Sequence, residues 1–143
     1  MDDRIRITLE QGVADVRLVR ADKMNALDDE MFEALRQAGE RLKHTPGVRA
    51  VVLSGEGRAF CAGLDTANFG RMASGQRGGE RLLQGKRTAG GANPPQHTVM
   101  VWRELPVPVI AAVHGVAYGG GFQLMLAADL RFVAPDTRLS IME

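Results

Sequence analysis

Residues 107–128 read VPVIAAVHGVAYGGGFQLMLAA, an apolar strand followed by a glycine-rich turn and an apolar helix. The strand is expected over 107–113, where apolar residues run without alternation. The helix is expected over 121–128, and the backbone N–H groups of its first turn have no partner within the helix. Because glycine lets a ligand approach the backbone closely, we interpret this turn as one wall of a binding site.

A second strand and turn of this kind occur earlier in the chain. Residues 50–53, AVVL, are typical of a strand buried on both faces of a sheet. The turn Gly55–Asp65, GEGRAFCAGLD, follows directly and is rich in small residues. Two backbone N–H groups, one from each turn and aimed at one point, would make an oxyanion hole.

The remaining elements follow from hydrophobic periodicity. Residues 5–10 and 13–19 alternate and predict a β-hairpin. Residues 25–45 repeat with a helical period, with Asn25 as the expected N-cap. A helix over 99–104 and short strands over 130–133 and 139–142 complete the prediction. Strands that alternate with helices at this spacing indicate an α/β fold built from βαβ-type units.

Residues 66–98 form a glycine- and arginine-rich segment that interrupts this pattern. They hold five basic residues and one acid, and we expect a surface loop within the domain. A loop of this length in a compact domain is normally functional or disordered.

Composition bounds the function. With 143 residues, 45% of them apolar, the chain is one domain or a piece of one. The net charge of +1 gives no argument for a nucleic-acid partner. The longest apolar run, Leu105–Val113, contains two prolines and is too short to cross a membrane. A single cysteine, Cys61, excludes an internal disulfide and fits the cytoplasm.

Two nucleotide-binding motifs occur only in part and do not match. The dinucleotide pattern that starts at Gly119 has Leu124 where the third glycine is required, and Gly85-Lys86 lacks the following Ser or Thr of a phosphate loop. No zinc spacing occurs, so we expect neither a metal nor a cofactor. Cys61 is interpreted as a small buried residue rather than a nucleophile, and His114 as a structural histidine.

Several segments in this order resemble the enoyl-CoA hydratase/isomerase (crotonase) superfamily. They are KMNAL at 23–27, FCAGLD at 60–65, PVIAAVHG at 108–115, GGG at 119–121, AD at 128–129 and SIME at 140–143. The resemblance implies a spiral of ββα units that acts on an acyl-CoA thioester, as a lyase or isomerase of fatty acid metabolism. It also implies that residues 1–143 are the incomplete N-terminal core of a crotonase-like domain without its C-terminal helical part. With that part present, a homotrimer or hexamer is expected.

The resemblance also assigns residues. The N–H groups of Ala62 and Gly120 would bind the thioester oxygen. Met24, Ala26 and the turn Ala62-Gly63-Leu64-Asp65 would line the path of the CoA chain. For Asp65 the alternative is a helix cap. The charge of the 66–98 segment, five basic residues against one acid, lies near Asp65 in the sequence, so we expect some of its basic residues, with Arg71 the nearest, to meet the CoA phosphates.

The chain departs from the family at one of two catalytic positions. Family hydratases resemble one another in carrying two glutamates there, and this chain has Gln123 and Glu143. An amide cannot accept a proton at neutral pH, which leaves Glu143 as the single acid/base. One carboxylate can move a proton between carbons, so double-bond isomerisation is favoured over hydration. The alternative is a non-catalytic crotonase-fold protein that acts through acyl-CoA binding or assembly.

Overall fold

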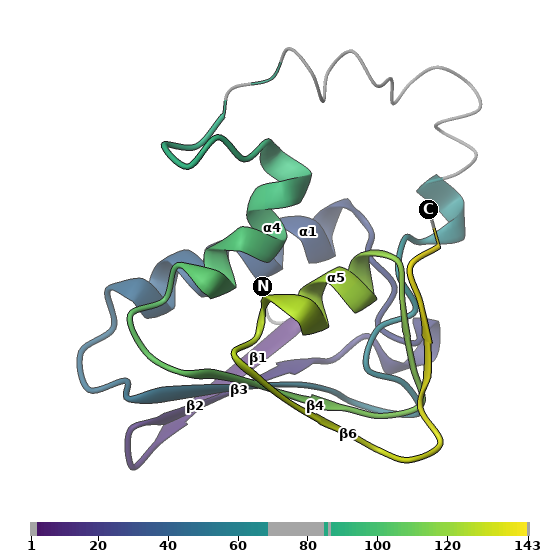
Figure 1. Cartoon of the computed structure of the whole chain (residues 1–143), viewed down its shortest axis with the longest axis horizontal. Coiled ribbons are helices and arrows are strands. Elements are labelled where there is room, and N and C mark those ends of the chain that lie inside the picture. The colour runs from purple at the N-terminus through teal and green to yellow at the C-terminus, as the bar shows by residue number, and fades with distance from the viewer. Residues whose placement is uncertain (1–2, 69–84, 86, 143) are drawn as a thin grey trace.

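The computed structural model describes residues 3–68, 85 and 87–142, and its centre is a five-stranded sheet in the order β1-β2-β3-β4-β6 (Figure 1). Strands β1 and β2 form the predicted antiparallel hairpin, and β2, β3, β4 and β6 run parallel. The bounds are Ile5–Glu10, Val13–Leu18, Ala50–Gly55, Val109–Val113 and Leu130–Val133. Gln11 and Gly12, both with positive φ, make the hairpin turn.

Three helices cover one face of this sheet: α1 (Asp29–Lys43), α4 (Pro94–Arg103) and α5 (Gly120–Ala127) (Figure 1). Helix α1 buries the apolar stripe that the sequence predicts, which includes Met31, Leu35 and Leu42. The core between the helices and the sheet contains Trp102 from α4 and alternate residues of the strands. The mixed α/β prediction is confirmed.

The prediction that residues 50–53 are buried on both sheet faces is wrong. Val51 and Leu53 are fully buried, whereas Val52 between them is half-buried. Successive side chains of a strand point to opposite faces, and the described helices lie on only one of them. The side chains of residues 50–53 are apolar on both faces of the sheet, but the described helices pack against only one of these faces.

Helix α1 begins later than predicted, and Asn25 is not its N-cap. The cap is Asp28, whose side chain accepts a hydrogen bond of 2.8 Å from the Met31 N–H. Asn25 is instead buried and has a positive φ of 55°. Residues 21–23 form a short 3₁₀ helix before it.

Part of the predicted loop over 66–98 is helical. Helix α4 starts at Pro94, because Asn93 and Gln96 form a capping box in which each side chain accepts from the other residue's backbone N–H. Residues 66–68 are helical as well. Residues 69–84 and 86 of that segment lie outside the described residues.

A second, two-stranded sheet lies beside α5. Strand β5 (Val116–Tyr118), in the middle of the glycine-bearing turn, pairs in parallel with β7 (Arg138–Ser140). Strand β5 is not predictable from hydrophobic periodicity, because three residues between glycines are too few to show a period. Among the described residues, no helix is long and apolar enough to cross a membrane.

Candidate functional site

The two glycine-bearing turns meet, as the sequence predicts. Strand β5 bridges the first turn through two hydrogen bonds of 3.1 Å, from the Cys61 N–H to the Val116 carbonyl and from the Tyr118 N–H to the Cys61 carbonyl. Glycine is required at this contact. A Cβ at Gly63 would lie 2.6 Å from the Tyr118 oxygen, and one at Gly121 would collide with the Cys61 carbonyl.

A third segment, residues 24–27, lies along the first turn. The Leu27 N–H donates to the Gly63 carbonyl over 2.7 Å, and the Asp65 N–H donates to the Leu27 carbonyl over 3.0 Å. The side chain of Asn25 fixes this segment to the first turn, since its Nδ2 donates to the carbonyls of Glu56 and Ala59 at 3.0 and 2.9 Å. Residues 24–27 and the two glycine-bearing turns, which include several of the segments that resemble the family, therefore form one structure.

The backbone N–H of Ala62, predicted as an oxyanion donor, is not free. It donates a 2.9 Å hydrogen bond to the Met24 carbonyl. Gly63 has a φ of +83°, which turns the backbone immediately after it. In the parallel bridge between Leu27 and Leu64, both hydrogen bonds use the neighbours of Leu64, so its own N–H points to the opposite side.

Where the two turns meet, the backbone N–H groups of Leu64 and Gly120 are available as hydrogen-bond donors to a ligand. Neither has a hydrogen-bond partner among the residues that the structure describes. Gly120 is the first residue of α5, where the helix leaves its N–H groups unpaired. Both residues line the same cavity. Leu64 is among the residues that the sequence analysis expects along the CoA chain. Its role as an N–H donor was not predicted, because that role depends on the pairing of residues 24–27 with the first turn.

The cavity has a volume of about 220 Å³ and lies between α1, α4 and α5. Its wall is mainly apolar, and Gln123 of α5 is a polar residue on it. The lining residues are Leu27, Phe32, Leu35, Leu64, Pro95, Gln96, Thr98, Val99, Gly120, Gln123 and Leu124. An apolar cavity with two N–H donors on its wall suits a short apolar group attached to a carbonyl.

Asp65 is held by the protein itself. Its Oδ1 accepts from the Ala67 N–H at 2.9 Å, and its Oδ2 accepts from Arg20 Nη1 at 2.5 Å. The hydrogen bonds from Ala67 and Arg20 hold the pKa of this carboxyl below its usual value. The interpretation of Asp65 as a helix cap is confirmed. Arg20 also donates to the Ala26 carbonyl at 3.0 Å, which ties this part of the 24–27 segment to the first turn.

The interpretations of Cys61 and His114 as structural residues are confirmed. Cys61 is fully buried and its Sγ donates to the Asn25 carbonyl over 3.1 Å. Burial raises the pKa of the thiol to about 12, so no thiolate nucleophile forms near neutral pH. His114 Nε2 lies 2.8 Å from the Gly57 carbonyl and thereby links the two turns.

Two predicted residues cannot be placed. Glu143, the expected acid/base, and Arg71, the expected phosphate contact, lie outside the described residues.

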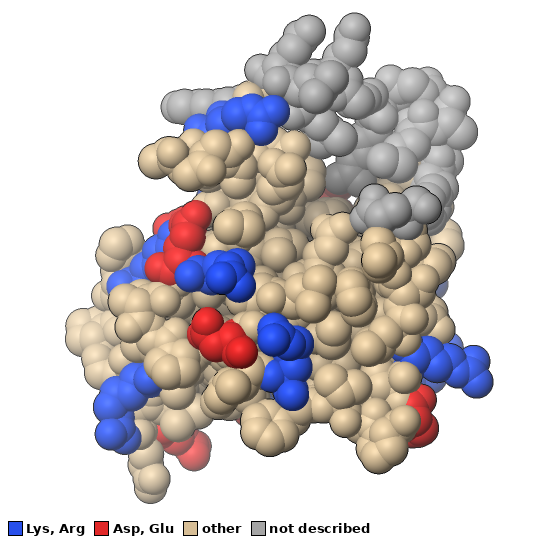
Figure 2. Space-filling model, in the orientation of Figure 1, with Lys and Arg blue, Asp and Glu red and all other residues tan. Residues whose placement is uncertain are grey.

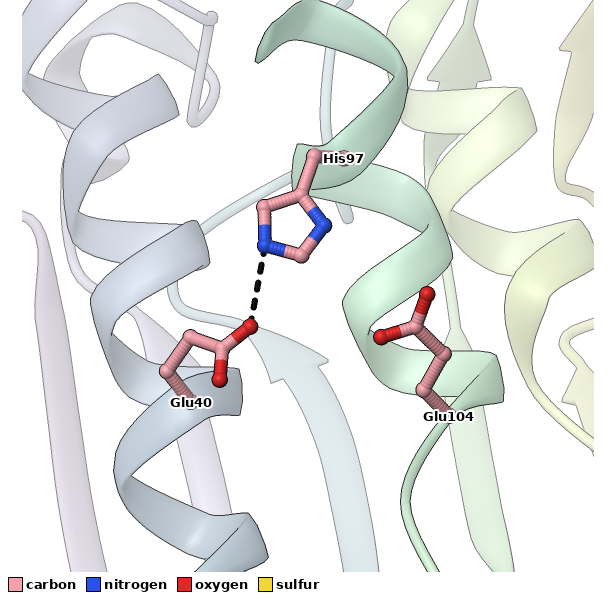
Figure 3. A group of neighbouring side chains, drawn as sticks. All are labelled: Glu40, His97 and Glu104. Carbon is pink, nitrogen blue, oxygen red and sulfur yellow. Dashed lines mark ion pairs between the residues drawn. The ribbon is translucent and has the colours of Figure 1, made fainter. Parts of the chain in front are cut away.

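A side-chain cluster that the sequence analysis missed joins α1 to α4. His97 Nε2 lies 2.9 Å from Glu40 Oε1, and Glu104 lies beside them (Figure 3). The Lys43 ammonium contacts Glu40 at 3.2 Å and Glu104 at 2.6 Å, so both carboxylates already face a cation. Burial opposes the charge on Lys43, but its two hydrogen bonds outweigh burial and raise its pKa. We interpret the cluster as a structural link between the helices.

Comparison with known proteins gives consistent results. Residues 8–143 match the family model described as enoyl-CoA hydratase/isomerase. The chain is 36% identical over 135 residues to "Probable enoyl-CoA hydratase echA6" of Mycobacterium leprae, covering 92% of this chain and 48% of the relative. It is 29% identical to the peroxisomal Delta(3,5)-Delta(2,4)-dienoyl-CoA isomerase of Arabidopsis thaliana, covering 97% and 50%.

Solved structures agree. A crystal structure from Streptomyces coelicolor A3(2) matches with a TM-score of 0.80 and 43% identity, covering 95% of this chain and 47% of the other. That of an enoyl-CoA hydratase from Mycobacterium avium subsp. paratuberculosis K-10 matches with a TM-score of 0.76 and 26% identity, covering 96% and 49%. The chain thus spans about half the length of the relatives that it matches.

Proposed function

Because the chain belongs to the enoyl-CoA hydratase/isomerase (crotonase) family, we propose that it supplies the thioester-binding part of an enzyme that acts on enoyl-CoA. The observation that carries this proposal is that Leu64 and Gly120, which line one apolar cavity, have backbone N–H groups without a hydrogen-bond partner among the described residues. No cofactor is required, because acyl-CoA is the substrate and the chemistry is a proton transfer.

In the proposed mechanism, the thioester oxygen lies between these two N–H groups. Loss of an α-proton places negative charge on that oxygen and forms an enolate. Donors fixed in the protein stabilise this charge without reorganising, and each is typically worth about 3 kcal/mol of barrier. Gly120 adds the positive end of the α5 dipole to this site.

Glu143 is the proposed acid/base. Its carboxylate takes a proton from one carbon, becomes neutral, and returns the proton to another carbon, which moves the double bond. Gln123 lines the cavity but cannot take a proton. Addition of water would require one group to activate water and another to protonate carbon. We therefore propose double-bond isomerisation ahead of hydration.

The test combines titration calorimetry with acyl-CoA and deuterium exchange at the substrate's α-carbon. We expect Glu143→Gln to lower exchange roughly 100-fold, the usual worth of a positioned acid/base, while binding is retained. The control is Glu10→Gln, an exposed glutamate of β1, which should change neither measurement. Full exchange in Glu143→Gln would contradict the assignment.

The alternative, a non-catalytic acyl-CoA-binding protein, is favoured by Gln123 in place of the family's glutamate. It predicts binding with no α-proton exchange in the unchanged protein. Gln123→Glu separates the two readings further, since an active site should gain water addition relative to double-bond migration.

A further inference from the structure

The cavity at the candidate site is elongated, and the two N–H donors lie at one end of it. Leu27 lies at this donor end, because a Cβ added at Gly120 would come within 2.5 Å of Leu27 Cδ1. Helices α1 and α5 both begin at the donor end and run away from it. Leu35, which lines the cavity, therefore lies about 9 Å along α1 from the first residue of that helix.

The far end of the cavity is closed by buried side chains. Leu35 and Leu124 are each 1% exposed, and Thr98 of α4 is 3% exposed. Thr98 Oγ1 donates to the Pro94 carbonyl at 3.2 Å and lies 3.5 Å from the Phe32 carbonyl, where α4 meets α1. The proton of this hydroxyl is thus used within the protein. The far end presents apolar groups and no free hydroxyl proton to a ligand.

The cavity wall also lacks charge. None of its lining residues is charged in the described part of the chain, and its two amide side chains, Gln96 and Gln123, are exposed and lie at the rim. The surface over α5 is likewise uncharged in the space-filling view (Figure 2). A carboxylate carried to the far end would lose its water without gaining a cation. The wall therefore favours an apolar group.

The volume of the cavity bounds the size of that group. An engineered apolar cavity of about 150 Å³ in another protein binds benzene, a molecule of six carbon atoms. At the same density, a volume of about 220 Å³ holds roughly nine non-hydrogen atoms. One of these is the thioester oxygen, which must reach the N–H groups of Leu64 and Gly120. About eight places remain for the carbon atoms of the acyl group.

We propose, on the basis of the proposed function, that the site accepts apolar acyl groups of up to about eight carbons, and that Val99 sets this limit. Val99 follows Thr98 on α4, is half-buried and lines the cavity. A larger side chain at this position fills space that the acyl group would occupy, and a smaller one releases space. A chain longer than the limit leaves the cavity and gains no further apolar contact there.

Titration calorimetry on the 143-residue chain, with saturated acyl-CoAs from butyryl-CoA to dodecanoyl-CoA, tests the limit. Each buried CH₂ group should strengthen binding about 4-fold. The gain should stop at roughly eight carbons, where the cavity is full. Adipoyl-CoA should bind roughly 10-fold or more weakly than hexanoyl-CoA, because a carboxylate replaces the terminal methyl group.

Two variants of one residue should move the limit in opposite directions, which unfolding cannot do. Val99→Phe should stop the gain roughly two or more carbons earlier, and Val99→Ala roughly two carbons later. The matched control is Met100→Phe, which places the same ring at the next position of α4, where the side chain is 39% exposed and does not line the cavity. It should leave the limit in place.

The outcomes separate this proposal from the proposed function. A gain that continues through dodecanoyl-CoA, or a limit that neither Val99 variant moves, would overturn the size limit while acyl-CoA binding still stands. Equal affinities for adipoyl-CoA and hexanoyl-CoA would overturn the preference for apolar groups. If the unchanged chain binds none of these acyl-CoAs, the proposed function is contradicted as well.

Discussion

Arg20 is the residue on which the geometry of the site most depends. Its guanidinium contacts Asp65 at 2.5 Å and Asp28 at 3.3 Å, and it donates to the Ala26 carbonyl. The side chains of Arg20 and Asp65 are only 16% and 12% exposed. One cation therefore joins the 24–27 segment, the first turn and the start of α1.

We expect Arg20→Met to lower the free energy of unfolding by about 2 kcal/mol or more, because it removes the cation that faces the largely buried Asp65 carboxylate and leaves Asp28 with Arg4 alone. Urea denaturation measures this change. The control is Arg17→Met, which removes the more exposed ion pair with Asp15 and should cost less than about 1 kcal/mol. Equal losses in the two variants would show that Arg20 has no special role.

Cys61 allows a second prediction at this scale. Because the thiol is fully buried and burial raises its pKa to about 12, iodoacetamide at pH 8 should label the native protein very slowly. In urea the same thiol should react at the rate of a free cysteine. Mass spectrometry follows both reactions. Rapid labelling of the folded chain would mean that the first turn opens readily.

At the scale of elements, the docking of α5 on the first turn fixes where its N-terminus points. Gly121 makes this contact possible, since an added Cβ would collide with the backbone of Cys61. Backbone cannot move aside as a flexible side chain does. We expect Gly121→Ala to cost about 1–3 kcal/mol of stability, the usual range for overpacking.

The control for this variant is Gly90→Ala, because an added Cβ there meets nothing closer than 3.8 Å. Thermal unfolding compares the two proteins. If Gly121→Ala melts at the same temperature as Gly90→Ala, the two turns are less tightly packed than the contact requires.

The elements also show what could be predicted from the sequence. Strands β3 and β4 are parallel, so the turns after them meet at one sheet edge, and the sequence analysis located both turns correctly. Which N–H is free could not be predicted. That depends on the pairing of residues 24–27 with 61–65 and on the positive φ of Gly63, neither of which is a local pattern.

Two wrong predictions, the N-cap of α1 and the start of α4, have a different cause. Asn25 and Asp28 are both good N-cap residues, and only tertiary contacts decide between them: Asn25 is required by the carbonyls of Glu56 and Ala59. The start of α4 did carry a local signal, Asn93 followed by two prolines and Gln96. The glycine-rich residues before Asn93 indicate a loop, and the predicted loop was therefore extended over the start of this helix.

At the scale of the whole molecule, three carboxylates with lowered pKa values join separate parts of the fold. Burial opposes the charge on Asp28 and on Glu40, but hydrogen bonds and nearby cations outweigh it: Arg4 and the Met31 N–H for Asp28, and Lys43 and His97 for Glu40. Asp65 is held in the same direction by Ala67 and Arg20. All three are charged in the folded protein at neutral pH.

These pKa values predict acid sensitivity of the whole fold. A carboxyl whose pKa is lower in the folded than in the unfolded chain contributes stability that is fully present above the unfolded pKa, about 4. That stability is lost as pH falls through the folded pKa, because the unfolded chain then binds more protons. The free energy of unfolding should therefore be nearly flat above about pH 5 and fall below about pH 4. Each such group can contribute a slope of at most about 1.4 kcal/mol per pH unit.

Urea denaturation at several pH values between 7 and 2.5 measures this slope, and Asp65→Asn isolates one contribution to it. The amide cannot titrate, so the variant should be less stable than the parent at pH 7, and the two should converge as the pH falls. Asp15→Asn is the matched control, because the partner that the described residues give Asp15 is the half-exposed Arg17, and an ion pair of this exposure contributes little to stability. A parent and an Asp65→Asn variant that keep the same difference in stability down to pH 2.5 would show that the Asp65 ion pair does not link protonation to folding. The acid sensitivity would then have to come from Asp28, the N-cap of α1, and from Glu40 within α1, whose partners include Arg4 before β1 and His97 on α4.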